Sequence, residues 1–513
     1  MTLEKNYFAI IDIGSNTMRL VIYLQEKAGR LREVENVKAV ARLRNHLDKQ
    51  DNLTQEGLNI LIDTLRSFND VVKTYDLKDL VCVATATIRQ AKNQMIIEQT
   101  VREQTGFLIR ILSELEEAYY GYLAVVNSTS ISEGVTVDIG GGSTEVTYFK
   151  DRQLVESFSF PFGALTLKEF YKSDIPTREE IGRLRNYLYI QFGTLPWLKH
   201  KAIPLIGIGG SARNLVQIDQ NMKNYPLAGL HQYKMMLQDI NHISNYLTGL
   251  TPEKLQKVEG LSNDRADIIL PAIEVFRCLY ETMHADCFVL SRKGLRDGVF
   301  YQQLSQNFDS NIFPNVLEDS IQELINDYDL NPKQIIHVQS LTRKIFHFFK
   351  EQKVIDLTDE DWLLLKRASY VFNLGKYIDS ESSSQHTFYL LANRTIDGLL
   401  HVDRLKLALV ASFKNKTVFK QYAHPYKNWF SKEDKKKIRM LGALLKFVYC
   451  LDATKRQVVQ DCEWKQLDND VMELVIYCNQ DWMPEKYQTE KQKKHLEKSL
   501  KQTIKLTFLP FKN

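Results

Sequence analysis

Two segments of the chain repeat one pattern: an apolar strand, the tripeptide Asp-Ile-Gly, a turn of small polar residues, and a second strand. The first copy spans residues 9–23 (AIIDIGSNTMRLVIY) and the second spans residues 135–148 (VTVDIGGGSTEVTY). Asp12 and Asp138 occupy the same place in the two copies, 126 positions apart. A duplicated supersecondary unit predicts two similar α/β halves that face each other across a cleft.

Short β-rich runs alternate with helical stretches through the first 300 residues, which is typical of layered α/β structure. The expected strands are 8–13, 19–24, 81–86, 109–112, 135–139, 145–149, 154–160, 204–208 and 287–290. The expected helices are 54–73, 94–104, 114–126, 178–192 and 264–279. The sequence thus supplies strands and helices for both predicted halves.

The second part of the chain has a different, mostly helical texture. Its expected helices are 316–328, 334–351, 359–372, 387–393, 402–413 and 432–449. A small α/β segment is expected at the end, with strands 471–477 and 504–509 around a Lys-rich helix at 485–502. A length of 513 residues allows several domains, and we predict four: 1–125, 126–305, 311–450 and 455–513. The chain lacks low-complexity linkers, so the domains are expected to be packed rather than tethered.

The composition is that of an ordinary globular protein, with 44% apolar and 25% charged residues. The six cysteines include no CxxC pair, so neither a zinc site nor a disulfide framework is expected. No apolar run reaches the roughly 18–20 residues that a membrane span needs. The first residues do not have the layout of a signal peptide. We therefore expect a cytoplasmic location and no membrane partner.

The net charge of +4 is unevenly distributed along the chain. Residues 401–513 contain 23 Lys and Arg against 13 Asp and Glu, whereas residues 1–400 contain 44 against 50. A basic region of this kind can steer and hold a polyanion. A solvated Lys-rich surface is the plainer interpretation of any single basic run, but the regional asymmetry favours an acidic partner.

The turn of the first copy combines features of a phosphate site. Gly14 permits a tight turn with exposed backbone N–H groups, and Ser15, Asn16 and Thr17 add donors. Such a concave set of donors binds phosphate oxygens. Asp12 at the end of the strand could hold a hydrated divalent cation beside the phosphate. A glycine-containing hairpin with an Asx turn explains this segment equally well.

The turn of the second copy is more specific, because it contains three consecutive glycines. Three glycines cost backbone entropy that a plain hairpin does not require. Close approach of the backbone to an anion, through Gly141, Gly142 and Ser143, is the favoured explanation. Asp138 repeats the possible metal role of the first copy, and Glu145 begins a strand from which its carboxylate could face the cleft.

Three further features carry weaker signals. The run Gly209-Gly210-Ser211 ends a strand and opens a helix, which is a layout that binds anions or nucleotides. Arg89 follows a buried strand and could contact phosphate bidentately or form a surface salt bridge. Glu116 and Glu117 begin a helix. Their spacing alone favours an interaction with the helix dipole over a general base.

These motifs, taken in order, closely resemble the exopolyphosphatase/guanosine pentaphosphate phosphohydrolase (Ppx/GppA) family. The matching segments are residues 12–17, 84–91, 116–118 and 138–145. Each motif is moderately specific, and their order is very specific. The resemblance extends over roughly residues 7–304 and includes residues 209–211, 261–265 and 290–298.

The resemblance implies a fold and a set of site residues. The fold is α/β, with two actin-like (ribonuclease H-like) halves around a cleft, an α-helical HD-like domain and a small α/β C-terminal domain. Glu117 matches the catalytic base and Glu145 the second essential acid. Asp12, Asp138 and Glu145 match carboxylates on the side of a Mg²⁺ cofactor. The phosphate-binding positions are Gly14, Ser15, Asn16, Thr17, Arg89, Gly141, Gly142, Ser143, Gly209, Gly210, Ser211 and Arg265.

The HD-like region departs from a working metal site. His337 and His386 fit histidine positions of the pattern, but Phe372-Asn373 stands where a histidine and an acid are expected. Lys414 replaces a further histidine. We therefore expect no second metal centre in residues 311–450. The domain is expected to act as a basic wall for long chains and as a dimer surface.

The leading functional expectation is an exopolyphosphatase that shortens inorganic polyphosphate by one phosphate at a time. A guanosine pentaphosphate (pppGpp) 5′-phosphohydrolase would use the same residues. A phosphotransferase to ADP and a non-catalytic sensor of polyphosphate or alarmone are further alternatives, and the acids Glu117 and Glu145 argue against the sensor. We expect no nucleic-acid partner and, by resemblance to the family's long members, a homodimer.

Overall fold

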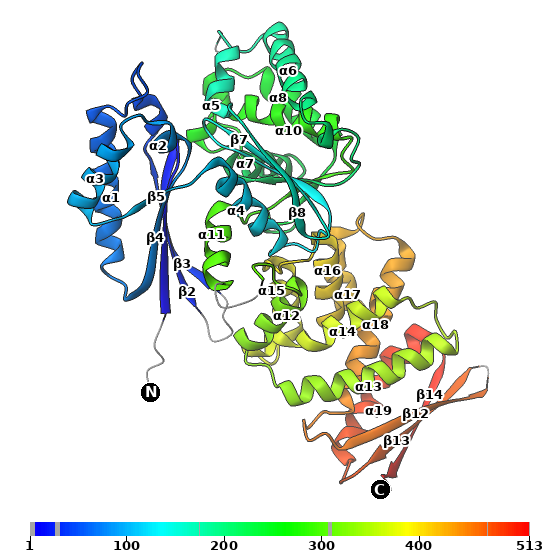
Figure 1. The fold of residues 1–513 in the computed structure, drawn as a ribbon. Helices are drawn as coiled ribbons and strands as arrows, with labels where there is room; N and C mark the ends of the chain where they lie inside the picture. The colour runs from blue at the N-terminus through cyan, green and yellow to red at the C-terminus, as the bar shows by residue number, and fades with distance from the viewer. Residues whose placement is uncertain (1–5, 26–30, 174, 306–309, 469, 512–513) are drawn as a thin grey trace. The chain divides into compact units, whose positions relative to one another are not determined.

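The computed structural model describes residues 6–25, 31–173, 175–305, 310–468 and 470–511 (Figure 1). Residues 1–5, on which the expectation about a signal peptide rests, lie outside this description. Contacts divide the chain into two compact units. The N-terminal unit comprises residues 1–225 and 230–316, and the C-terminal unit comprises residues 226–229 and 317–513.

The first sheet of the N-terminal unit has the strand order β3-β2-β1-β4-β5. Strands β1, β2 and β3 form an antiparallel meander, and β4 and β5 continue parallel to β1. Their bounds are β1 Asn6–Ile13, β2 Thr17–Gln25, β3 Leu31–Val40, β4 Leu77–Ala84 and β5 Ile109–Ile111. The strand predicted to continue to Ala86 ends at Ala84, because a short helix, α2 (Ala86–Gln90), begins there.

The second sheet repeats this topology. Its strand order is β10-β11-β9-β6-β7-β8, with an antiparallel meander β6-β7-β8 followed by β9 and β11 parallel to β6. The bounds are β6 Gly134–Ile139, β7 Thr144–Lys150, β8 Gln153–Phe160, β9 Leu205–Ile208, β10 Lys234–Met235 and β11 Phe288–Leu290. The prediction of two similar α/β halves is confirmed.

Helices cover the two sheets, and each has an apolar face that explains its position. On the first sheet, α1 (Gln55–Val72) buries Leu61, Leu65 and Phe68 in the same core as the strands, and α3 (Gln94–Thr105) joins it. Apolar residues at helical spacing form such a face. The helices beside the second sheet are α5 (Ala164–Leu167), α6 (Arg178–Gly193), α7 (Gly209–Met222), α8 (Leu237–Thr248) and α10 (Ile269–Met283) (Figure 1).

Two helices connect the halves. Helix α4 (Glu114–Val126) contacts strands of the second sheet and also α11 (Leu295–Leu304). Val299 and Phe300 of α11 lie in one buried cluster with Ile10 and Val83 of the first sheet. The predicted boundary at residue 125 therefore falls at the end of a helix that packs against the following half.

The C-terminal unit is helical and ends in a small α/β segment. Its helices are α12 (Val316–Asp327), α13 (Pro332–Glu351), α14 (Asp359–Val371), α15 (Ser383–Asn393), α16 (His401–Ala411), α17 (Lys416–Ala423) and α18 (Lys432–Cys450). The segment that follows consists of β12 (Val459–Asp468), β13 (Val471–Cys478), α19 (Met483–Leu500) and β14 (Thr503–Pro510), with strand order β12-β13-β14. Trp464 of β12 packs against Phe348 and Phe349 of α13, so this segment is packed on the helices. The described helices include none long and apolar enough to cross a membrane.

Candidate functional site

The two predicted phosphate loops have the same backbone geometry and touch each other. Gly14 N–H donates to the Thr17 carbonyl at 3.1 Å, and Gly140 N–H donates to the Ser143 carbonyl at 2.9 Å. A Cβ atom on Gly141 would lie 3.0 Å from the Ser15 Cβ, which is tighter than ordinary packing. The β1–β2 and β6–β7 turns therefore face each other, as the duplicated motif predicted, and a larger residue than glycine would crowd this contact.

An aspartate stands near the end of the strand that leads into each loop. Asp12 is on β1 and Asp138 is on β6, and neither side chain is freely exposed. Burial raises the pKa of Asp138 to about 6, against the opposing charges of Arg213 and Arg265. Burial also raises the pKa of Asp12, while Arg296 and Arg19 oppose the rise. Such groups gain from a cation that keeps them ionised.

The adjacent acids of α4 have separate tasks. The Ser113 hydroxyl accepts from the Glu116 N–H at 3.2 Å, and the Glu116 carboxylate accepts from the Ser113 N–H at 2.8 Å, forming a capping box. Glu116 thus completes the helix N-terminus, as the spacing favoured. Glu117, one residue on, instead accepts from Arg89 Nη1 at 3.0 Å.

The environment of Glu117 suits a proton acceptor. Its side chain and that of Arg89 are each 15% exposed. Burial raises the pKa of Glu117 to about 7, with Arg89 opposing the rise and the charges of Asp138 and Asp12 adding to it. Enzymes commonly tune a general base to this range. Arg89 also donates to the Leu112 carbonyl at 2.8 Å, which fixes the arginine against the start of α4.

Glu145 lies in the same electrostatic neighbourhood. It begins β7 with a side chain that is almost fully buried, and Ser159 Oγ donates to its Oε1 at 3.0 Å. Burial and then the charge of Glu117 raise the pKa of Glu145 well above its usual value, while a hydrogen bond from Ser143 opposes the rise. The structure therefore brings the two predicted catalytic acids into mutual influence.

The third predicted run joins this site at the start of α7. Gly209 has φ +81°, and a Cβ there would collide with Asp138 Oδ1. A Cβ on Gly210 would collide with the guanidinium of Arg265, whose Nη1 donates to Ser211 Oγ at 3.3 Å. The two glycines therefore let an aspartate and an arginine lie over a helix N-terminus, a place where anions bind.

Two predicted phosphate-binding side chains carry unused donors. Asn16 is buried, and its Nδ2 has no hydrogen-bond partner in the described part of the chain. Arg89 Nη2 is likewise buried without a hydrogen bond to any described residue. Buried donors without partners are costly, and a phosphate oxygen would satisfy them. Thr17 contributes through its carbonyl, which closes the first turn.

Sequence reasoning missed several arginines of the site. Arg19, Arg213 and Arg296 interact electrostatically with one another and with the two aspartates. Burial, followed by the charges of Arg296, Arg19 and Arg265, lowers the pKa of Arg213 to about 10. Arg44 adds a guanidinium whose Nη1 would lie 3.4 Å from a Cβ on Gly142. Arg19 and Arg213 each follow a glycine-containing turn within a few residues, which was the signal available in the sequence, whereas Arg44 lies far along the chain from Gly142.

The carboxylates fit a magnesium ion that is shared with substrate. The described ranges contain no group of three or more His, Cys, Asp or Glu side chains that could hold a metal. Mg²⁺ is usually bound through one or two carboxylates together with water and substrate phosphate. Asp12 and Asp138 meet this requirement. A metal role for Glu145, whose carboxylate is bound to Ser159, stays a prediction.

His337 and His386 of the C-terminal unit have different surroundings in the structure. His337 is partly buried, and its Nε2 has no hydrogen-bond partner among the residues the structure covers. Burial lowers the pKa of His337, and the charge of Asp452 opposes the change. His386 contributes its Cβ to the packing around Gly375. Asn373 and Lys414 instead line a cavity, which is described below.

Known proteins match both parts of the chain. A model of the Ppx/GppA phosphatase family matches residues 21–307, and a model of Ppx/GppA phosphatase domain III matches residues 316–500. A guanosine-5′-triphosphate,3′-diphosphate pyrophosphatase of Pseudoalteromonas translucida (strain TAC 125) is 24% identical over 436 residues, which cover 82% of each chain.

Solved structures agree with these matches. The Ppx/GppA family member of Aquifex aeolicus is 27% identical, with a TM-score of 0.54, and covers 60% of this chain and 100% of its own. An exopolyphosphatase of Cytophaga hutchinsonii shares the fold at 20% identity, with a TM-score of 0.54, 58% of this chain and 98% of its own. The chain therefore belongs to the Ppx/GppA phosphatase family and is a hydrolase of phosphoanhydride bonds.

Proposed function

We propose that this enzyme is an exopolyphosphatase that uses Mg²⁺ and releases the terminal phosphate of inorganic polyphosphate. The observation that carries hydrolysis is the pair Glu117–Arg89, a mostly buried carboxylate that accepts from the guanidinium at 3.0 Å and lies within electrostatic reach of Asp12 and Asp138. A carboxylate with a pKa of about 7 is a suitable proton acceptor near neutral pH.

In the proposed mechanism, the loop N–H groups, Asn16 Nδ2 and Arg89 Nη2, which lies 4.0 Å from Glu114, hold the terminal phosphate. Glu117 orients a water molecule and takes its proton as the water oxygen bonds to phosphorus. The bridging P–O bond breaks, and its electron pair leaves with the shortened chain. When bound, Mg²⁺ would be held by Asp12 and Asp138 and would neutralise phosphate charge. The surrounding arginines stabilise the charge that spreads over the phosphoryl oxygens.

The charge of residues 401–513 supports a long polyanion as the substrate. These residues hold ten more basic than acidic side chains, and such a field attracts a long phosphate chain more strongly than a small nucleotide. We further propose a homodimer, which light scattering of the purified chain would test.

A pppGpp 5′-phosphohydrolase is the second candidate, because the curated relative from P. translucida carries that activity in its name. The chemistry at Glu117 would be the same. Phosphate release from long-chain polyphosphate and from pppGpp, measured side by side, separates the two. A higher kcat/KM for pppGpp would overturn the proposed substrate and leave the proposed base intact.

The base is tested by a pair of adjacent variants. Glu117→Gln should lower kcat about 10²–10⁴-fold, the usual contribution of a general base, and should still bind substrate. Glu116→Gln makes the same change of charge one residue away, at the capping position. It should keep the rate within a few-fold and lose up to about 1 kcal/mol of stability. Equal rates for the two variants would remove Glu117 from its role.

A further inference from the structure

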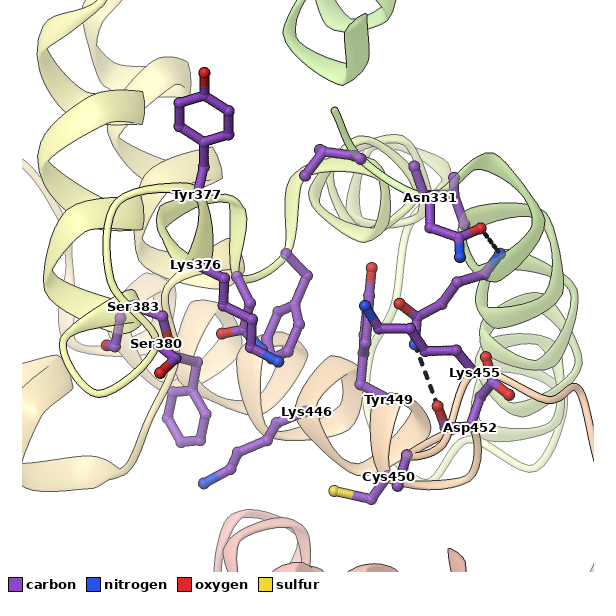
Figure 2. Close-up of a pocket in the computed structure, with 18 of the residues that line it drawn as sticks. Asn331, Lys376, Tyr377, Ser380, Ser383, Lys446, Tyr449, Cys450, Asp452 and Lys455 are labelled. Carbon is purple, nitrogen blue, oxygen red and sulfur yellow. Dashed lines mark hydrogen bonds between the residues drawn. The ribbon is translucent and has the colours of Figure 1, made fainter. Parts of the chain in front are cut away.

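A cavity of about 680 Å³ lies within the C-terminal unit. Its walls come from the start of α13, the 3₁₀ turn Leu374–Tyr377, the start of α15, and parts of α18 and α19. Figure 2 shows Lys376, Lys446 and Lys455 around this space, and Lys414 also lines it. Four cationic side chains from four separate segments therefore converge on one pocket. Its size suits a small ligand.

The four lysines have no ion-pair partner in the part of the chain that the structure describes. Across the described ranges, none of Lys376, Lys414, Lys446 and Lys455 forms an ion pair with a carboxylate. Lys446 Nζ donates to the carbonyl of Lys414 at 2.6 Å, which brings it close to a second lysine. Like charges in one pocket repel each other, and a bound anion would relieve that repulsion.

The environment of the lysines agrees with this repulsion. Partial burial and then the charge of Lys455 lower the pKa of Lys376. Burial lowers the pKa of Lys446, and the charges of Lys414 and Lys494 lower it further, against Cys450.

Three carboxylates also line the pocket, and within the described residues none of them forms an ion pair with one of its lysines. Asp329 and Glu381 are exposed at its edge. Asp452 is buried, and its Oδ1 accepts from the Gln457 N–H at 2.9 Å. Burial raises the pKa of Asp452, while the hydrogen bond from Gln457 and the charge of His337 oppose the rise.

The rest of the lining supplies hydrogen-bond donors and flat surfaces. Ser380 and Ser383 lie beside the N-terminus of α15, where the N-cap Ser382 makes no side-chain capping bond. The Asp379 carboxylate accepts from the Ser382 N–H at 2.8 Å at this helix start, so the hydroxyls of Ser380 and Ser383 are the donors that line the pocket here. The ring pair Phe372–Tyr449, with centroids 4.4 Å apart, forms part of the wall. Asn373 and Lys414 line the same pocket. They occupy positions at which the HD-like pattern expects metal ligands, and they supply an amide and a cation instead.

We propose that this pocket is a second ligand site, which binds a compact oligophosphate group, either free or as part of a nucleoside polyphosphate. The site lies wholly within the C-terminal unit and is separate from the Glu117 site in the N-terminal unit. The proposal goes beyond hydrolysis and does not depend on which substrate is cleaved.

Hydrogen–deuterium exchange of the full chain tests the proposal, because it locates binding along the sequence. The Glu117→Gln background is used so that the probes are not consumed during labelling. Inorganic tripolyphosphate and GTP are the two probes. We expect slower exchange in segments 372–384 and 446–456 when a probe is added. Protection by tripolyphosphate identifies a free oligophosphate as sufficient, whereas protection by GTP alone identifies a nucleoside polyphosphate.

The matched variants remove equal charge at different places. Lys376→Gln/Lys446→Gln should raise the concentration needed for half-protection at least about tenfold, since each lysine supplies a charge-assisted contact. Lys435→Gln/Lys436→Gln, on the exposed first turns of the same helix α18, should leave protection unchanged. Thermal unfolding should show the pocket variant to be as stable as the parent or more stable. Protection confined to the N-terminal unit, or equal loss in both variants, would overturn the proposal.

Discussion

At the scale of single residues, two neighbouring acids have different roles: Glu116 caps helix α4, and Glu117 is the proposed base. The pattern Ser113-x-x-Glu116 is a capping-box signature, so the sequence could have assigned Glu116 to the helix end and left Glu117 free. The hydrogen bond between Glu117 and Arg89 could not be derived in the same way. This hydrogen bond links Arg89 on α2 to Glu117 on α4, two residues that are 28 positions apart in the sequence.

The pKa of Glu117 predicts how the rate depends on pH. A base must be ionised to accept a proton, and burial raises the pKa of this carboxyl to about 7. We expect kcat/KM to rise as the pH rises through about 7 and to level off above it. A profile measured from pH 5 to 9 checks this. A rate that is already flat from pH 5 upward would show that an unperturbed acid serves as the base.

The raised pKa of Glu117 also predicts that its ionised carboxylate lowers the stability of the fold at alkaline pH. The folded state holds the proton up to about pH 7, whereas in the unfolded chain the pKa of this carboxyl has the ordinary glutamate value of 4.5. Stability from this group is therefore full below pH 4.5 and is lost as the pH rises through about 7. Without divalent cations at pH 8, Glu117→Gln should have a free energy of unfolding up to about 3 kcal/mol higher than the parent, and therefore a higher unfolding temperature. At pH 4 the two proteins should unfold alike.

At the scale of elements, most strands could be predicted because they are apolar runs buried on both faces. Strands β3 and β12 could not, because their residues alternate with charged, exposed ones. A strand with one solvent-facing side lacks a continuous apolar signal. Helix α10 begins at Ile269 rather than near Asp264, because residues Asn263–Arg265 form a separate 3₁₀ turn that carries Arg265.

The junction of β9 and α7 depends on glycine in a way that can be measured. Gly209→Ala would place a methyl group against the Asp138 carboxylate at a backbone φ of +81°. We expect at least a tenfold loss of kcat/KM together with lower stability. Gly182→Ala in α6 is the control, because its Cβ would meet no described atom within 4 Å. It should leave kcat/KM unchanged and raise stability by about 0.5–1 kcal/mol. Unchanged activity of Gly209→Ala would argue against a fixed Asp138.

At the scale of the whole molecule, the duplication was visible in the sequence because both copies keep the same strand–loop–strand motif. The exchange of helices between the halves was not visible. Helix α11 follows the second sheet in the chain, yet Phe300 packs with Tyr23 and Ile10 of the first. Local periodicity shows that a helix has an apolar face and does not show which sheet will cover it.

The division into two units predicts which properties belong to each. The solved A. aeolicus chain is matched over its full length by 60% of this chain, a share close to the size of the N-terminal unit. We therefore expect residues 1–316 to fold and to hydrolyse tripolyphosphate with a kcat within a few-fold of the full chain. The KM for long-chain polyphosphate should rise at least tenfold, because the basic residues 401–513 are absent.

The salt dependence of KM tests independently whether residues 401–513 bind the long chain. For the full chain, raising the salt from 50 to 300 mM should increase the KM for long-chain polyphosphate several-fold and change kcat little, since screening weakens attraction between exposed charges. The truncated chain should show a much weaker salt effect on the same KM. Parallel salt dependence in both chains would place long-chain binding in the N-terminal unit, where the arginines around Asp12 and Asp138 would then account for it.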